Sequence, residues 1–109
     1  MTRPTAQEMI DALQLTPLPG EGGYFRETWR GSQTLSAEAT GYGERSCGTA
    51  IYYFLTPQTW SALHRLRIDE VYHFYDGDPV ELFELHADGS LTRTILGGET
   101  TAEIGRAHV

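Results

Sequence analysis

The sequence predicts an all-β domain, either a sandwich or a barrel, preceded by one short helix. Six short segments rich in aromatic and β-branched residues follow one another at short spacing, separated by turn-forming residues. Such a succession is typical of sandwiches and barrels. A length of 109 residues allows one domain at most, and a hydrophobic content of 39% is enough for a core.

The helix is predicted at the N-terminus, in "TAQEMIDALQL". Thr5 and Glu8 have the spacing of a capping box, which satisfies free backbone N–H groups at a helix start. Four apolar residues share one face of this helix, namely Ala6, Met9, Ile10 and Leu13. The following "TPLPGEGG" cannot continue a helix, and its glycines most simply shape a turn.

The six strand-like segments begin after that turn. A hairpin is expected at Asp88-Gly89, between the last two of them. Residues 30–46 are polar and rich in small side chains, so we expect a long surface loop there. The predicted strands are "YFRETWR" (24–30), "TAIYYFL" (49–55), "SALHRLRI" (61–68), "EVYHFY" (70–75), "VELFELH" (80–86) and "SLTRTIL" (90–96).

Charge and composition exclude several classes of partner. A net charge of −7 argues against nucleic acid or an anionic membrane as the main partner. A single cysteine, Cys47, rules out an internal disulfide framework and fits a reducing compartment. No stretch approaches the ~20 apolar residues of a membrane span, and the N-terminus does not resemble a signal peptide. We therefore expect a soluble cytoplasmic protein.

The last seven residues, "EIGRAHV", match the translation of a common short-read sequencing adapter, whose next codon is a stop. We interpret residues 103–109 as a non-native tail and exclude His108 from the candidate ligands. The native gene is then expected to continue past Ala102. Long reads across the locus should show the frame diverging at or just after Ala102; a native "EIGRAHV" followed by a stop would contradict this prediction.

The stretch "HRLRIDEVYHFYDGDP" (64–79) concentrates the residues that could carry chemistry. Alternation in a strand places His64 on the apolar face of its segment, and Glu70 and Tyr72 together on one face of the next. His64 and Glu70 are thus expected to face one cavity, with His73 pointing away, into a subunit interface. A lone histidine on an apolar face is more often a satisfied core residue than a ligand, and that alternative stays open.

A second group of candidates lies in "YFRETWR". Alternation puts Tyr24, Arg26, Thr28 and Arg30 on one face of this strand. An inward Arg26 could hold an anionic substrate group through two hydrogen bonds. An ion pair with Glu27 or Asp69 is an equally supported alternative for Arg26.

The motifs resemble a known family. Glu70, six residues and then Gly77 match the end of the first cupin motif, G-x5-H-x-H-x3,4-E-x6-G. One of the two metal histidines of that motif is absent, because Leu66 or Ala62 stands in its place. More specifically, "EGGYFRETWR", "TAIYYFL" and "SALHRLRIDEVYHFYDGDPVEL" resemble the small-cupin family called cupin family five, over residues 8–99.

The resemblance implies a double-stranded β-helix, the cupin jelly roll, of which residues 1–102 would form a C-terminally truncated part. It also implies a homodimer. The family is similar to the sugar-nucleotide 3,5-epimerase cupins, whose catalytic histidine occupies a comparable strand position.

Three functions follow from these observations. The first is an epimerase or isomerase of a carbohydrate-like small molecule. In that function His64 would be the general base and Tyr72 or another tyrosine the acid, and the ligand would be bound by Arg26, Glu70 and Tyr24. The second is a non-catalytic ligand-binding cupin. The third is a metal-dependent oxygenase.

No cofactor is predicted from the present residues. His64 and Glu70 are weak candidates for a divalent metal whose other ligands would come from further along the native chain.

Overall fold

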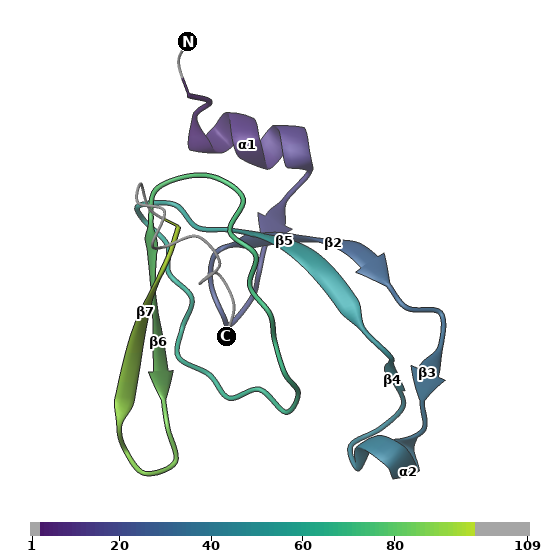
Figure 1. The fold of residues 1–109 in the computed structure, drawn as a ribbon. Helices are drawn as coiled ribbons and strands as arrows, with labels where there is room; N and C mark the ends of the chain where they lie inside the picture. Colours follow the sequence, from purple (N-terminus) through teal and green to yellow (C-terminus); the bar gives the residue numbers. More distant parts are fainter. Residues whose placement is uncertain (1–2, 98–109) are drawn as a thin grey trace. The chain divides into compact units, whose positions relative to one another are not determined.

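The computed structural model describes residues 3–97, which form two compact units, residues 3–64 and 65–97. Both helices and a three-stranded antiparallel sheet of order β1-β2-β5 belong to the first unit, and the β6-β7 hairpin belongs to the second (Figure 1). The prediction of an all-β chain with a short N-terminal helix is confirmed. The elements are α1 (Ala6–Leu13), β1 (Thr16–Pro17), β2 (Tyr24–Arg30), β3 (Thr34–Leu35), α2 (Ala37–Thr40), β4 (Arg45–Ser46), β5 (Thr49–Phe54), β6 (Val80–Leu85) and β7 (Leu91–Leu96).

Helix α1 begins with the predicted capping box. The backbone N–H of Glu8 donates to the Thr5 hydroxyl oxygen at 3.1 Å, and the Thr5 N–H donates to the Glu8 carboxylate at 3.0 Å. The helix ends at Gln14, whose backbone is left-handed with φ of 56°. Leu15 follows and is buried. Local sequence therefore determines both ends of this helix.

The capping box gives an acid-sensitive helix start. Hydrogen bonds from the backbone and then the side chain of Thr5 hold the pKa of the Glu8 carboxyl below its ordinary value. A depressed folded-state pKa stabilises the folded state above the unfolded-state pKa, and this stability is lost as the pH falls through the folded-state pKa. Thr5→Ala should lower stability by about 1 kcal/mol and move the Glu8 pKa, measured from its carboxyl carbon shift, back toward the ordinary value. An unchanged Glu8 pKa would contradict the capping role.

A β-bulge changes which residues of β2 share a face. Arg26 pairs with Tyr52 of β5 and Glu27 with Ile51, but Trp29 pairs with Ala50, so Thr28 is the additional residue. One extra residue shifts the alternation by one position. The prediction that Arg30 shares a face with Tyr24 and Arg26 is therefore wrong.

The side-chain contacts agree with this register. Arg30 lies on the face of Glu27 and donates to its carboxylate at 2.6 Å. On the opposite face, the Arg26 guanidinium lies over the ring of its cross-strand neighbour Tyr52, 5.4 Å from the ring centroid. The two faces of the β2-β5 pair are referred to below as the Arg26 face and the Tyr53 face, since Tyr53 pairs with Phe25.

Residues 30–46, predicted as a long loop, contain a short two-stranded ladder, β3-β4, and the single-turn helix α2. Ser36 caps this turn by accepting a hydrogen bond from the Ala39 N–H at 3.1 Å. Gly41 ends it in a left-handed conformation. The composition predicted a loop because serine and glycine are common both in loops and at helix ends. Here these residues cap the short helix α2.

The strands predicted at residues 61–68 and 70–75 are not present in the described chain. An extended segment becomes a strand only when a neighbour pairs with its backbone, and no ladder in residues 3–97 includes either segment. Some alternation persists in the second segment. Tyr72 and Phe74 are half-buried there, whereas Val71, His73 and Tyr75 are exposed.

The predicted hairpin is confirmed in the second unit. Strands β6 and β7 pair in register from Val80 with Leu96 to Leu85 with Leu91. The turn is closed by the Gly89 N–H, which donates to the His86 carbonyl at 2.9 Å, and by Asp88, which accepts from the Ser90 N–H at 2.8 Å. An Asp-Gly pair is a strong signal for such a turn.

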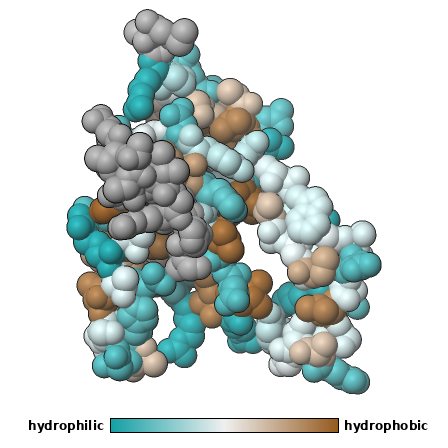
Figure 2. Space-filling model, viewed as in Figure 1, coloured by the Kyte–Doolittle hydropathy of each residue, from teal (hydrophilic) through white to brown (hydrophobic). Residues whose placement is uncertain are grey.

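Little of the apolar surface of the described residues is buried. Leu15 and Leu96, each 6% exposed, are the buried hydrophobic residues of this part of the chain. Large hydrophobic side chains are exposed in both units, and Figure 2 shows brown hydrophobic residues at the surface among hydrophilic ones. The helices within residues 3–97 are all too short and too polar to cross a bilayer.

Candidate functional site

The candidate site is built on the glycine-rich turn between β1 and β2. Leu18 donates its N–H to the Gly23 carbonyl at 3.0 Å, and its own carbonyl accepts from the Gly22 N–H at 3.1 Å. On the Tyr53 face of the sheet, the Tyr53 hydroxyl donates to the Gly22 carbonyl at 2.6 Å. The turn is therefore held both by its own backbone and by the sheet.

This turn positions Glu21 against the segment that contains His64. The Ala62 N–H donates to the Glu21 carbonyl at 2.7 Å. The Glu21 carboxylate oxygen Oε1 lies 2.5 Å from Nε2 of His64. Both side chains are partly exposed, at 27% for Glu21 and 33% for His64, so solvent and small molecules can reach the pair. We call it the Glu21–His64 pair.

Both ring nitrogens of His64 face acceptor oxygens. Nδ1 lies 2.6 Å from the Ala62 carbonyl oxygen, and Nε2 faces the Glu21 carboxylate. A neutral imidazole can donate from only one nitrogen, whereas the imidazolium donates from both. The ring can therefore donate to one of these oxygens when it is neutral and to both when it is protonated.

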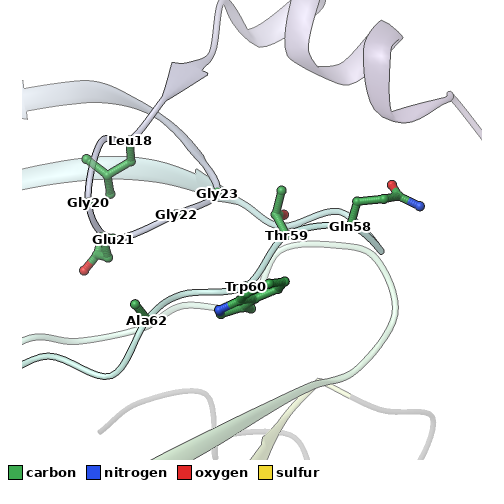
Figure 3. A pocket seen from close by; sticks show the side chains of 9 residues that line it. All are labelled: Leu18, Gly20, Glu21, Gly22, Gly23, Gln58, Thr59, Trp60 and Ala62. Carbon is green, nitrogen blue, oxygen red and sulfur yellow. The ribbon is translucent and has the colours of Figure 1, made fainter.

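A groove lies beside the glycine turn and is lined by Glu21, the carboxylate of the Glu21–His64 pair (Figure 3). His64 itself is not one of the lining residues. The groove has a volume of about 360 Å³ and is open to solvent. The turn forms one wall, and the Trp60 indole and Ala62 lie on the other. The nine residues that line it are Leu18, Gly20, Glu21, Gly22, Gly23, Gln58, Thr59, Trp60 and Ala62.

A tight turn after β5 brings Trp60 to this groove. The Thr59 N–H donates to the Thr56 carbonyl at 3.0 Å, and the Thr56 N–H donates to the Thr59 hydroxyl oxygen at 2.8 Å. Pro57 suits the second position of such a turn, because its φ is already restricted. The Trp60 residue remains 73% exposed, so much of its indole is available for contact.

Substitution of Gly22 tests whether the glycine-rich turn positions the Glu21–His64 pair. Its φ is 102°, and an added Cβ would clash with the backbone carbonyl oxygen of Trp60. Gly20 is the matched control, because its φ is 80° and an added Cβ would meet nothing within 4 Å. Gly22→Ala should displace the Glu21 side chain from His64, whereas Gly20→Ala costs only the ~1 kcal/mol of left-handed strain.

The measurement is the His64 ring proton signals in NMR spectra of the two variants. Large changes in Gly22→Ala with near-native signals in Gly20→Ala are expected. Native signals in Gly22→Ala would show that the turn does not position the pair.

Arg26 and Tyr24 lie on the Arg26 face of the sheet, opposite to the Tyr53 face that supports the glycine turn. Arg26 is half-buried, and its Nε donates to the Leu13 carbonyl oxygen at 2.7 Å. Its side chain thus connects α1 to Tyr52 of the sheet. Within the first unit Glu27 pairs with Arg30, and the alternative ion pair of Arg26 with Asp69 stays a prediction.

Glu70, Tyr72 and His73 belong to the second unit. Tyr72 is half-buried, while Glu70 and His73 are exposed. Their roles, and the shared cavity of His64 and Glu70, stay predictions. Among residues 3–97, the histidine, cysteine and carboxylate side chains do not form a group of three that could hold a metal ion.

Sequence reasoning missed Glu21 and Trp60. The sequence pattern indicates a turn around Glu21 and gives no specific role to Trp60. A carboxylate flanked by glycines on both sides is the signal that was available for Glu21, since such a turn can bring a side chain close to another segment. For Trp60, an aromatic directly after a Thr-Pro turn was the signal.

Comparison with protein families places the chain. The family model described as Cupin superfamily (DUF985), cupin family five, matches residues 7–108. The chain belongs to this cupin family. The resemblance identified from the motifs is confirmed, and the all-β cupin fold with it.

A solved structure agrees with the family. The cupin chain is similar to a hypothetical protein from Leishmania major, with a TM-score of 0.78 and 33% sequence identity over 94% of this chain. It spans 61% of the length of that protein. No curated protein matches the chain significantly.

Proposed function

We propose that this cupin is an epimerase or isomerase that acts on a carbohydrate-like small molecule, with His64 as the general base. The observation that carries the proposal is the Glu21–His64 pair at the edge of a groove of about 360 Å³. An imidazole paired with a carboxylate that lines a space for a small molecule is an arrangement suited to proton transfer.

The reaction would begin with neutral His64, whose Nδ1–H donates to the Ala62 carbonyl oxygen. As the substrate binds, the Glu21 carboxylate would turn from Nε2 to a substrate hydroxyl, and the freed Nε2 accepts the proton from a substrate carbon next to a carbonyl group. The electron pair of the broken C–H bond forms an enolate. An acid, for which Tyr72 is proposed, returns a proton to the opposite face of that carbon. Solvent then carries the proton from imidazolium to tyrosinate.

The other ligand contacts stay as proposed from the sequence, with less support for Arg26. The Arg26 side chain contacts Leu13 and Tyr52, which favours a role in attaching α1 to the sheet. Glu70 and Tyr24 are kept as proposed ligand contacts. A homodimer, a cytoplasmic location and a native domain that continues beyond residues 1–102 also stay proposals, and residues 103–109 lie outside the described part of the chain.

The second candidate is a non-catalytic ligand-binding cupin. The open groove with its exposed Trp60 supports this function as well as the first, because neither feature requires chemistry. The metal-dependent alternative requires ligands from outside residues 3–97, since His64 and Glu70 alone are too few.

Exchange of substrate protons with solvent separates the first two candidates. The full native protein is incubated in D₂O with a panel of reducing sugars, ketoses and nucleotide sugars, and proton NMR follows each C–H signal next to the carbonyl or anomeric carbon. The proposal expects one class of sugar to lose that signal at a rate proportional to protein concentration. Binding of sugars without exchange in any of them would leave the non-catalytic function.

A further inference from the structure

The charge of the groove lining indicates which carbohydrates it can take. Of its nine lining residues, Glu21 is the only one that is ionisable, and none is basic. A phosphate or pyrophosphate group placed there would meet the Glu21 carboxylate, in a chain whose net charge is −7. The positive charge that His64 acquires on protonation is already paired with that carboxylate.

Arg26, which the sequence suggested as a binding residue for an anionic group, does not line this groove. Arg26 lies on one face of the β2-β5 pair, and Tyr53, which supports the glycine turn, lies on the other. The Arg26 guanidinium donates to Leu13 and lies over Tyr52. Binding a phosphate would require it to leave both contacts and change faces.

The neutral part of the lining suits a single polar ring. The exposed Trp60 indole offers a flat apolar surface, and the Glu21 carboxylate supplies a hydrogen-bond acceptor in the same lining. A sugar ring has the matching chemistry, with an apolar face of C–H bonds and hydroxyl groups at its edge. A volume of about 360 Å³ is sufficient for one sugar ring.

We infer that the groove binds a neutral monosaccharide, stacked on Trp60 and hydrogen-bonded to Glu21, and that it discriminates against phosphorylated and nucleotide-linked sugars. This inference rests on the proposed function, because it names the substrate class of the same site. It assigns Trp60 as a specificity-determining residue and gives Glu21 two contacts in turn, with His64 before the ligand binds and with a ligand hydroxyl afterwards.

Binding is tested separately from turnover. Saturation-transfer NMR on the full native protein uses methyl β-glucoside, methyl α-mannoside, myo-inositol, glucose 6-phosphate and uridine diphosphate glucose. The expected result is saturation of at least one neutral probe through its C–H face, unchanged between 50 and 500 mM NaCl, with weaker or absent saturation of the phosphorylated probes.

Trp60→Ala and Trp29→Ala form the matched pair of variants, because both tryptophans are exposed and only Trp60 lines the groove. Trp60→Ala should weaken neutral-sugar binding by about tenfold or more, and Trp29→Ala should leave it unchanged. Preferred binding of uridine diphosphate glucose, weakening with salt, would overturn the inference, as would equal effects of the two variants.

The outcomes of this experiment differ from those of the exchange assay. Neutral-sugar binding that depends on Trp60, without solvent exchange in any sugar, would uphold the inference on binding and remove the epimerase function. Exchange confined to nucleotide sugars and dependent on His64 would uphold the epimerase function and remove the inference.

Discussion

His64→Ala should lower the rate of substrate proton exchange by a factor of about 10² to 10⁴, the usual contribution of a general base. The melting temperature should change little. The ion pair with Glu21 is partly exposed, and such pairs contribute about 1 kcal/mol or less to stability. The rate and the melting temperature are measured on the same full native protein, so a lost rate with an intact fold assigns His64 to the chemistry.

His73→Ala is the matched control, since His73 lies in the neighbouring segment and is exposed in the second unit. Its exchange rate should equal that of the native protein. A lower melting temperature of this variant would agree with the dimer-interface position predicted for His73. A native exchange rate in His64→Ala, or an equal loss in His73→Ala, would show that His64 is not the base.

Residues 1–109, expressed alone, should aggregate or fold only marginally. Apolar faces of both units are exposed, and the buried hydrophobic residues of the described chain are Leu15 and Leu96. Exposed apolar faces and unpaired strand edges favour association between chains. We expect a broad thermal transition, strong binding of the dye ANS and a high-molecular-weight fraction in gel filtration.

The exposed hydrophobic residues lie along strands and connecting segments of both units. They are Trp29, Leu35, Ile51, Trp60, Leu63, Leu66, Ile68, Val71, Tyr75, Phe83, Leu85 and Leu91. Most belong to segments that the sequence predicted as strands with one apolar face. A monomer that melts cooperatively above ~60 °C, beyond the usual midpoint for a mesophilic domain, would contradict this prediction.

Locally determined features were predictable from the sequence. The Thr5–Glu8 capping box and the Asp88-Gly89 turn depend on residues a few positions apart, and both are present in the structure. Strands β2 and β5 were predicted from their aromatic and β-branched residues, and they pair with each other.

The remaining features depend on contacts between distant segments. The extra residue at Thr28 appears only when β2 is aligned with β5, so the sequence predicted the wrong face for Arg30. The pairing of Glu21 with His64 likewise joins two segments that are distant in the sequence, the glycine-rich turn before β2 and the irregular segment after β5. The pattern of apolar and polar residues within each segment does not indicate such a contact. His64 was therefore predicted as a site residue, whereas its carboxylate partner was not.

A crystal structure of the full native protein with the sugar that exchanges most rapidly tests the central claim most directly. The account predicts a sugar ring against the Trp60 indole, with its exchanging carbon within reach of Nε2 of His64 and a hydroxyl bonded to Glu21. A sugar bound in a different cavity, with His64 and Glu21 still paired and remote from it, would contradict the account.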